Sequence, residues 1–118
     1  MNETCTVYTT MNLISKKWSL VILLEIYKGT NGKKRFSELK NSLPDITAKI
    51  LSTRLKELEK QGLIYKKIHT AHVPVKCEYS LTKRGKEFVE IIKQIKKWAL
   101  KWYIDNPVCE HLNCTNCE

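Results

Sequence analysis

Apolar residues recur at helical spacing in three successive segments of the first part of the chain. Residues 16–28 are apolar nearly all round, which predicts a helix buried at the centre of the fold. A shorter helix is expected before it, over about 7–14. The pair Asn31-Gly32 tolerates positive φ and predicts a turn, after which a short helix is expected over 36–43.

A further helix is predicted over 48–61, preceded by Thr47, a good N-cap residue. Leucines spaced i, i+4 and i+7 form a stripe that would face the core, at Leu51, Leu55 and Leu58. At about 100° per residue, the opposite face is polar and basic, with Lys49, Thr53, Lys56 and Lys60, and Ser52 beside it. Gly62 follows at the C′ position, where glycine is favoured. We call residues 48–61 the candidate recognition helix.

The pattern then changes to two strand-like runs, 63–69 and 76–81, which predict a β-hairpin. Thr82 is the expected cap of a long helix that runs to about residue 104. Its apolar stripe is wide and comprises Phe88, Ile91, Ile92, Ile95, Trp98, Ala99 and Trp102. Such a stripe exceeds what one small domain needs, so it predicts a dimer interface. Packing on the chain's own core is the alternative.

The net charge of the chain indicates what kind of partner it binds. Lys and Arg number 21 against 12 Asp and Glu, a formal charge of +9, and residues 47–86 hold ten basic residues against three acidic ones. This excess attracts polyanions. An anionic membrane would fit the charge as well, but no apolar run approaches the roughly 18 residues of a membrane span. The N-terminus has no signal-peptide pattern, so a cytoplasmic location is expected.

The order of helix, short helix, sharp turn, helix and hairpin predicts a mainly α fold, a winged helix-turn-helix with a small β-hairpin wing. One helix of this fold presents polar and basic side chains to the major groove while a core holds its other face. The other interpretation is that the lysines form an ordinary solvated face. The residues predicted to contact double-stranded DNA are Thr47, Ala48, Lys49, Ser52, Thr53 and Lys56 at the helix, and Lys66, His72 and Lys76 at the hairpin.

Several segments together resemble one family. Residues 13–20, LISKKWSL, resemble the LIGGKWTL segment of HxlR-type regulators. Residues 35–39, RFSEL, look like the family's R-F-x-E-L, and residues 50–59, ILSTRLKELE, look like M-L-S-x-R-L-x-E-L-E. Residues 62–64 and 78–82 match the wing strands and the entry to the last helix. The resemblance covers about residues 5–102 in the expected order.

The resemblance implies a homodimeric winged-helix repressor or activator, distantly similar to MarR-type proteins, whose first and last helices build the dimer. The sequence departs from the family in two places. Ser15-Lys16 replaces paired glycines, which is expected to alter the turn between the first two helices. The stretch 29–34 is a few residues longer than usual. Neither departure lies within the residues of the candidate recognition helix.

Five cysteines, an odd number, indicate thiols, metal ligands or buried residues rather than a disulfide framework. Cys5 lies thirteen residues before Trp18, where the family has a cysteine that senses oxidants or electrophiles in some members. Cys5 is therefore a redox candidate, and an inert thiol in a short N-terminal arm is the alternative. Cys77 is expected to fill space in the core or at the dimer side.

The C-terminal tail, residues 106–118, contains three cysteines and one histidine within nine residues, at Cys109, His111, Cys114 and Cys117. Thiolates and imidazole are ligands of tetrahedral zinc, and Cys114-x-x-Cys117 has the spacing by which two sulfurs bind one ion. These residues are candidate zinc ligands. Three alternatives remain open: part of an iron–sulfur pattern, redox pairing of Cys114 with Cys117, and a tail whose thiols have no role.

We divide the chain into an HxlR-type DNA-binding and dimerisation domain, 1–105, and the cysteine-rich tail. The predicted function is sequence-specific, homodimeric transcriptional regulation that responds to thiol chemistry or metal, with an unknown effector. The alternatives are a nonspecific architectural nucleic-acid-binding protein and a metal or thiol-redox protein. The sequence has no glycine-rich phosphate loop and no Ser/His/Asp or Cys/His arrangement on rigid elements. No enzymatic activity is therefore predicted.

Overall fold

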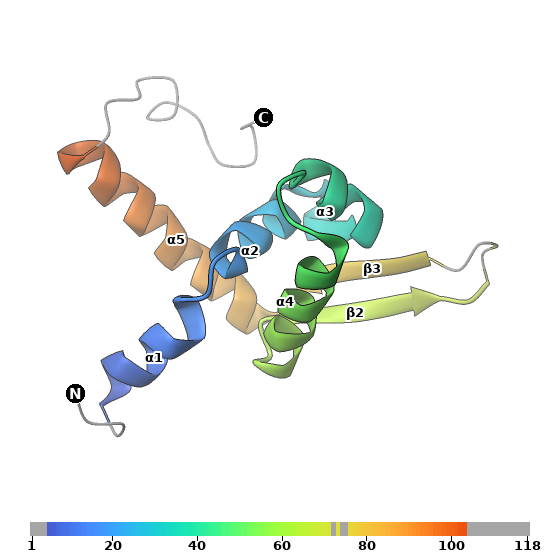
Figure 1. Ribbon diagram of the computed structural model, residues 1–118, viewed down its shortest axis with the longest axis horizontal. Coiled ribbons are helices and arrows are strands. Elements are labelled where there is room, and N and C mark those ends of the chain that lie inside the picture. Colours follow the sequence, from blue (N-terminus) through green and yellow to red (C-terminus); the bar gives the residue numbers. More distant parts are fainter. Residues whose placement is uncertain (1–4, 72, 74–75, 104–118) are drawn as a thin grey trace.

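The computed structural model describes residues 5–71, 73 and 76–103. The elements follow in the order α1 (Thr6–Ile14), α2 (Ser19–Lys28), a 3₁₀ turn η1 (Thr30–Gly32), β1 (Lys33–Arg35), α3 (Phe36–Ser42), α4 (Ala48–Lys60), β2 (Ile64–His69), β3 (Lys76–Leu81) and α5 (Lys83–Trp102) (Figure 1). The fold is a mainly helical winged helix-turn-helix, as the sequence predicted. The boundaries of α1, α3, α4, β2 and β3 lie within one residue of those predicted, and α5 ends two residues earlier.

The core forms where α2 meets α3, α4, α5 and the sheet. Ile22, Leu23 and Ile26 of α2 are fully buried, which confirms the central helix expected from its apolar sequence. The leucine stripe of α4 and Val89 of α5 are buried against the same cluster. One helix thus supplies the centre on which the other elements are placed.

The sheet corrects the predicted wing, because it has three antiparallel strands in the order β1-β3-β2 and not two. The hairpin β2–β3 is present as expected, with Ile64 opposite Leu81 and His69 opposite Lys76. Strand β1 was missed because its residues, Lys33 to Arg35, are all basic and show no apolar alternation. It forms through pairing with β3, where Arg35 lies opposite Glu78, and this long-range pairing leaves no local signal.

The helix predicted over 16–28 begins only at Ser19. Trp18 has a φ of 85°, a left-handed conformation that a right-handed helix cannot contain. The Trp18 carbonyl still accepts the first helical hydrogen bond, from Ile22 N at 2.8 Å. The partly buried Trp18 side chain packs against the core cluster, and this contact helps to offset a backbone conformation that is costly for a bulky residue. Asn31 and Gly32 also have positive φ, as predicted for that turn.

The start of α5 is tied to the end of α4. Thr82 Oγ1 caps α5 by accepting a hydrogen bond from Gly85 N at 3.1 Å, and it donates to Gly62 O at 2.6 Å. A Cβ on Gly85 would lie 2.0 Å from Leu63 O, so only glycine permits this close approach of the helix to the backbone. These contacts fix α5 relative to the candidate recognition helix.

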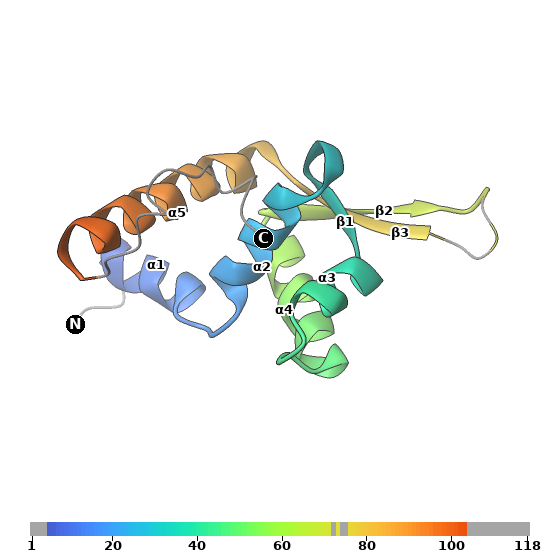
Figure 2. The same cartoon turned by 90° about the horizontal axis from the view of Figure 1, so that it is seen from above.

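The helices α1 and α5 project from the body of the molecule. Both extend from the end opposite the hairpin, with α1 beneath the outer half of α5 in the view of Figure 2. None of the described side chains of α1 is buried, and only Gly85 and Val89 of α5 are buried. The outer half of α5 exposes large apolar side chains, among them Trp98 at 55% and Trp102 at 65%. The predicted apolar stripe of α5 is therefore covered by the core only near its beginning.

Candidate nucleic-acid interface

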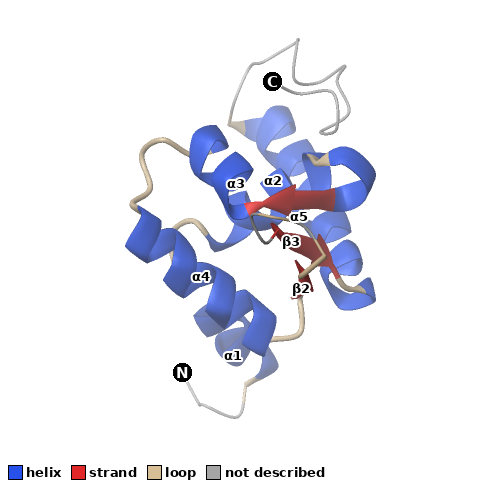
Figure 3. Ribbon diagram, turned by 90° about the vertical axis from the view of Figure 1, so that its right-hand side faces the viewer, coloured by secondary structure: helices blue, strands red, loops and turns tan. Residues whose placement is uncertain are grey.

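Helix α4 has one buried face and one exposed face, as its sequence predicted. Leu51, Leu55 and Leu58 are buried in the core. The side chains on the opposite face are exposed at Lys49, Thr53, Lys56 and Lys60, and Ser52 beside them is partly exposed. Figure 3 shows α4 at the surface, with α3 next to it and the two joined by a short loop. The structure thus holds a polar, basic helix face outward on a rigid support.

The N-terminus of α4 is capped as expected. Thr47 Oγ1 accepts a hydrogen bond from Ile50 N at 3.2 Å, and both Thr47 and Ala48 are exposed. Thr53 is exposed, and its Oγ1 donates a hydrogen bond to Lys49 O at 2.9 Å. Among the described residues, no ion pair engages Lys49 or Lys56. Their ammonium groups are therefore available to an anionic partner.

The hairpin presents a second basic segment. Lys66 on β2 is exposed and lies opposite Tyr79, and Lys76 on β3 is partly exposed and lies opposite His69. His69 Nε2 lies 2.6 Å from Glu78 Oε1, so the acidic residue of this segment contacts a wing histidine. His72, predicted to contact DNA, lies outside the described residues.

A group of charged residues on the flank of α4 was not predicted from the sequence. Glu57 Oε1 accepts a hydrogen bond from Lys16 Nζ at 3.0 Å, and Glu57 Oε2 accepts one from Arg54 Nη1 at 2.6 Å. The bonds from Lys16 and then Arg54 hold the pKa of Glu57 below its ordinary value, so the carboxylate is ionised at neutral pH. Arg54 and Glu57 are spaced i, i+3, which could have been recognised. Lys16 lies 41 residues from Glu57, and no local pattern reports that contact.

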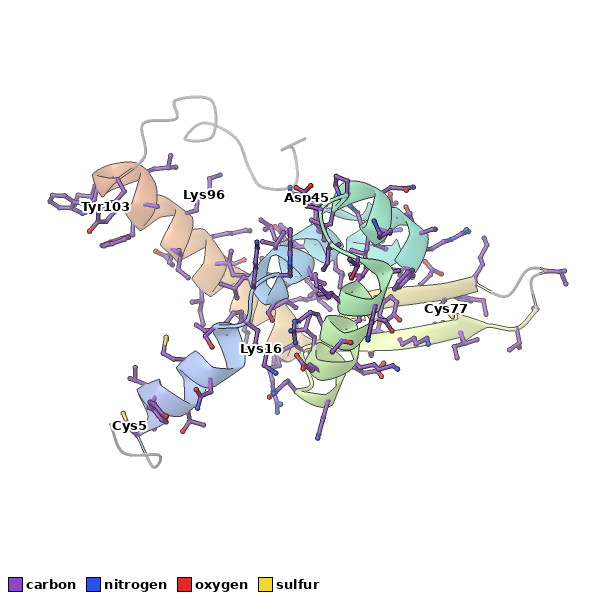
Figure 4. All side chains as sticks on the ribbon, in the orientation of Figure 1. Cys5, Lys16, Asp45, Cys77, Lys96 and Tyr103 are labelled. Atoms are coloured by element: carbon purple, nitrogen blue, oxygen red, sulfur yellow. The ribbon has the colours of Figure 1, made fainter. Side chains whose placement is uncertain are left out.

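The two cysteines in the described part of the chain are both partly exposed and unbridged. Cys5 immediately precedes α1, and its carbonyl accepts a hydrogen bond from Thr9 N at 3.0 Å. Cys77 lies on β3 opposite Ile68. Figure 4 shows Cys5 and Cys77 at opposite ends of the molecule. Cys5 therefore belongs to the projecting helices, whereas Cys77 belongs to the wing.

The predicted zinc ligands Cys109, His111, Cys114 and Cys117 lie outside the described residues. Over residues 5–71, 73 and 76–103, no three or more His, Cys, Asp or Glu side chains gather as a metal site would require. Within the same ranges, no helix has both the length and the apolar character to span a bilayer.

Residues 13–106 match the HxlR-like helix-turn-helix family. The HTH-type transcriptional regulator YvaP from Bacillus subtilis is 39% identical over 92 residues, which cover 78% of this chain and 82% of that protein.

Two solved structures show the same fold. A structure described as a MarR-family transcriptional regulator from Porphyromonas gingivalis W83 has a TM-score of 0.76 at 36% identity, covering 86% of this chain and 96% of that one. The redox regulator HypR in its oxidised form has a TM-score of 0.70 at 36% identity, covering 82% and 96%. Since the family match spans most of the sequence, the chain belongs to the HxlR-like helix-turn-helix family of transcriptional regulators, a family of DNA-binding proteins and not of enzymes, as the sequence predicted.

Proposed function

We propose that the protein is a sequence-specific transcriptional regulator that binds double-stranded DNA as a homodimer through α4. The observation that carries the proposal is the division of α4 into a face buried by three leucines and an exposed face of lysine, serine and threonine side chains. A helix held in this way enters the major groove with its polar side chains toward the base edges.

The polar residues on or beside the exposed face of α4, and those at its N-terminus, receive roles from their positions. Lys49, Ser52, Thr53 and Lys56 lie on or beside the exposed face and would contact base edges. Thr47 and the amide groups of the first turn, beginning at Ala48, would hold a phosphate, because a helix N-terminus attracts anions. On the wing, Lys66, His72 and Lys76 would contact flanking phosphates or the minor groove. The lysine ammonium groups would add affinity by releasing counterions from the DNA.

A second copy of the chain is the proposed occupant of the apolar surface on the projecting helices. Ile91, Ile95, Trp98 and Trp102 are exposed along α5 at a spacing of four, three and four residues. Val7 and Met11 are exposed on α1 at a spacing of four. Both helices project from the same end of the molecule (Figure 2). A surface this apolar is unfavourable in water and typical of an obligate interface. A two-fold dimer would place half-site centres about 34–36 Å apart, or a multiple of that.

Thiol chemistry at Cys5 is the proposed regulatory input. Cys5 is partly exposed and immediately precedes α1, one of the helices assigned to the dimer interface. A similar structure is that of a redox regulator, HypR. Oxidation or alkylation of Cys5 would change how the two α1 helices pack, and with it the spacing of the two recognition helices.

The remaining assignments follow from this function. We assign residues 1–105 to the DNA-binding and dimerisation domain and residues 106–118 to the cysteine-rich tail, for which zinc binding is a prediction. We expect the protein in the cytoplasm, where a regulator of this family meets the chromosome.

Selection of bound fragments from random DNA tests the proposal. We expect enrichment of a pseudo-palindrome, and a selected fragment should outcompete unrelated DNA by at least about a thousandfold. Little discrimination would instead support the architectural alternative. The Lys49→Ala/Lys56→Ala variant should lose affinity for the selected fragment. A Lys33→Ala/Lys97→Ala variant, which removes the same charge at two exposed lysines outside α4 and the hairpin, is the control. Unchanged affinity of the Lys49→Ala/Lys56→Ala variant would refute the assignment of α4.

A further inference from the structure

The direction of α1 relative to the rest of the molecule depends on one short turn, residues 15–18. None of the described side chains of α1 is buried, so packing within the protomer does little to hold the helix. At the end of the turn, Trp18 is anchored by its contact with the core and by its left-handed backbone. The intervening residues, Ser15 to Lys17, are all exposed.

Lys16 connects this turn to α4. Its Nζ atom lies 3.0 Å from Glu57 Oε1, and Figure 4 shows Lys16 beside α4 at the point where the chain leaves α1. Glu57 is itself held on α4, because Arg54 Nη1 donates to its other oxygen at 2.6 Å. The two carboxylate oxygens of Glu57 thus bind different elements: one accepts from Arg54 on α4 and the other from Lys16 in the turn.

Glu57 is well placed to act on the recognition surface. It follows Lys56 directly and lies one helical turn beyond Thr53, on the flank of the exposed face of α4. A change in the contact between Lys16 and Glu57 would therefore shift the helix that carries the proposed base contacts. In the family segments that this chain resembles, the position of Lys16 is a glycine, which has no side chain to make such a contact.

We propose that Lys16 is a positioning residue for DNA binding: through Glu57 it fixes the angle between α1 and α4, and thereby the spacing of the two recognition helices in the dimer. The inference rests on the proposed function, in which α1 contributes to the dimer interface and α4 enters the major groove. It also supplies a physical connection from Cys5, at the far end of α1, to the DNA-binding surface.

The expected effect is modest, because the side chains of Lys16 and Glu57 are 50% and 35% exposed and water screens the pair. Loss of the pair should lower affinity for correctly spaced half-sites by about two- to fivefold at low salt. The loss of the pair should be recognised by a weaker preference for one spacing between half-sites. Affinity for half-sites moved by one base pair should change less, so the preference for the correct spacing falls.

The test compares wild type with Lys16→Gln, Glu57→Gln and the double variant. Fluorescence anisotropy measures binding to the selected fragment and to fragments lengthened or shortened by one base pair between half-sites. Lys17→Gln removes the same charge one residue away and is the control. We expect Lys16→Gln to reduce the spacing preference, Lys17→Gln to retain it, and Lys16→Gln to have no further effect when Glu57 is already Gln.

The outcomes separate the inference from the function on which it rests. If Lys16→Gln weakens binding equally at all spacings, and does so in the Glu57→Gln background as well, Lys16 contacts phosphate and the positioning role is wrong. An unchanged spacing preference in Lys16→Gln also overturns it. If the wild-type protein selects no paired half-sites, the proposed dimeric function is wrong. This result is obtained with the wild type alone and is therefore distinct from a failure of the positioning role.

Discussion

Lys34 Nζ lies 3.0 Å from Glu25 Oε2 and joins strand β1 to the central helix α2. Lys28 Nζ approaches the other oxygen of Glu25 at 3.1 Å, and Ser42 Oγ accepts a further hydrogen bond from Lys34 at 3.1 Å. The side chains of Glu25 and Lys34 are only 14% exposed. Burial raises the pKa of Glu25, but the hydrogen bonds from Lys34 and Lys28 outweigh it and leave the pKa below its ordinary value of 4.5.

This arrangement predicts a pH-dependent contribution to stability. Because the folded pKa of Glu25 is lowered, its ionised form stabilises the fold above about pH 4.5, and the contribution is lost as the pH falls through the folded pKa. Glu25→Gln should therefore lower the free energy of unfolding by about 1–3 kcal/mol at neutral pH, and by less near pH 3. Urea unfolding at both pH values measures the difference. Glu90→Gln, at an exposed pair, is the control and should change stability by less than about 1 kcal/mol.

Charge placed on the outer half of α5 should separate the protomers. Trp98→Glu or Ile95→Glu puts a carboxylate into the proposed apolar interface, where burial of a charge is costly. Light scattering should then show a monomer at micromolar concentration, and tight DNA binding should be lost with the dimer. Lys97→Glu, in the same stretch of α5, changes charge at an exposed lysine and should leave the dimer intact. A wild-type monomer at this concentration would contradict the prediction.

Lys56 on α4 should contribute directly to DNA affinity. If Lys56 contacts a base, Lys56→Ala should weaken binding to the selected fragment by roughly 1–3 kcal/mol and relax the preference at one position of the site. If it contacts phosphate, affinity should fall evenly across sequences and the salt dependence should become shallower. Titrations of several fragments at two salt concentrations distinguish the two roles. Equal affinities of wild type and variant would remove Lys56 from the interface.

Cys5 should make DNA binding sensitive to thiol reagents. Diamide or a quinone should change the affinity of wild type for its selected DNA, while Cys5→Ser should respond much less. Cys77→Ser, which removes the other described thiol at the wing, is the matched control and should behave as wild type. If Cys5→Ser remains as sensitive as wild type, the responding thiol lies elsewhere in the chain.

The tail should bind zinc if its cysteines and histidine act as ligands. Protein purified without chelator should then carry up to about one zinc per chain, since four such ligands complete a tetrahedral site. Cys114→Ser/Cys117→Ser should lose the metal. Metal analysis of fully reduced protein after incubation with zinc measures the ratio. Less than about a tenth of an equivalent would favour a tail without a metal role.

Local sequence signals predicted the helices and the hairpin but not the structure that depends on contacts between distant residues. The leucines of α4 and the Thr47 cap identified that helix, because periodicity and capping act within a few residues. Strand β1 and the left-handed Trp18 could not be found in this way. The first forms only by pairing with β3, and the second is stabilised by distant core residues.

The candidate site shows the same division between local and distant information. Exposure of Lys49, Thr53 and Lys56 follows from the periodicity of α4 and agrees with the structure. The contact of Lys16 with Glu57 depends on how the turn after α1 folds back toward α4, which no neighbouring residue specifies.

The division of α4 into two faces also affects how the sequence of such a protein can evolve. Substitutions at exposed helix positions usually alter stability by no more than about 0.5 kcal/mol, whereas truncation of a buried leucine costs about 2–5 kcal/mol. Lys49, Thr53, Lys56 and Lys60 can therefore be exchanged among polar residues while Leu51, Leu55 and Leu58 keep the helix in place. Under the proposed function, gene duplicates of this chain could acquire new target sequences with little loss of stability, and a designer would randomise the four proposed base contacts, Lys49, Ser52, Thr53 and Lys56.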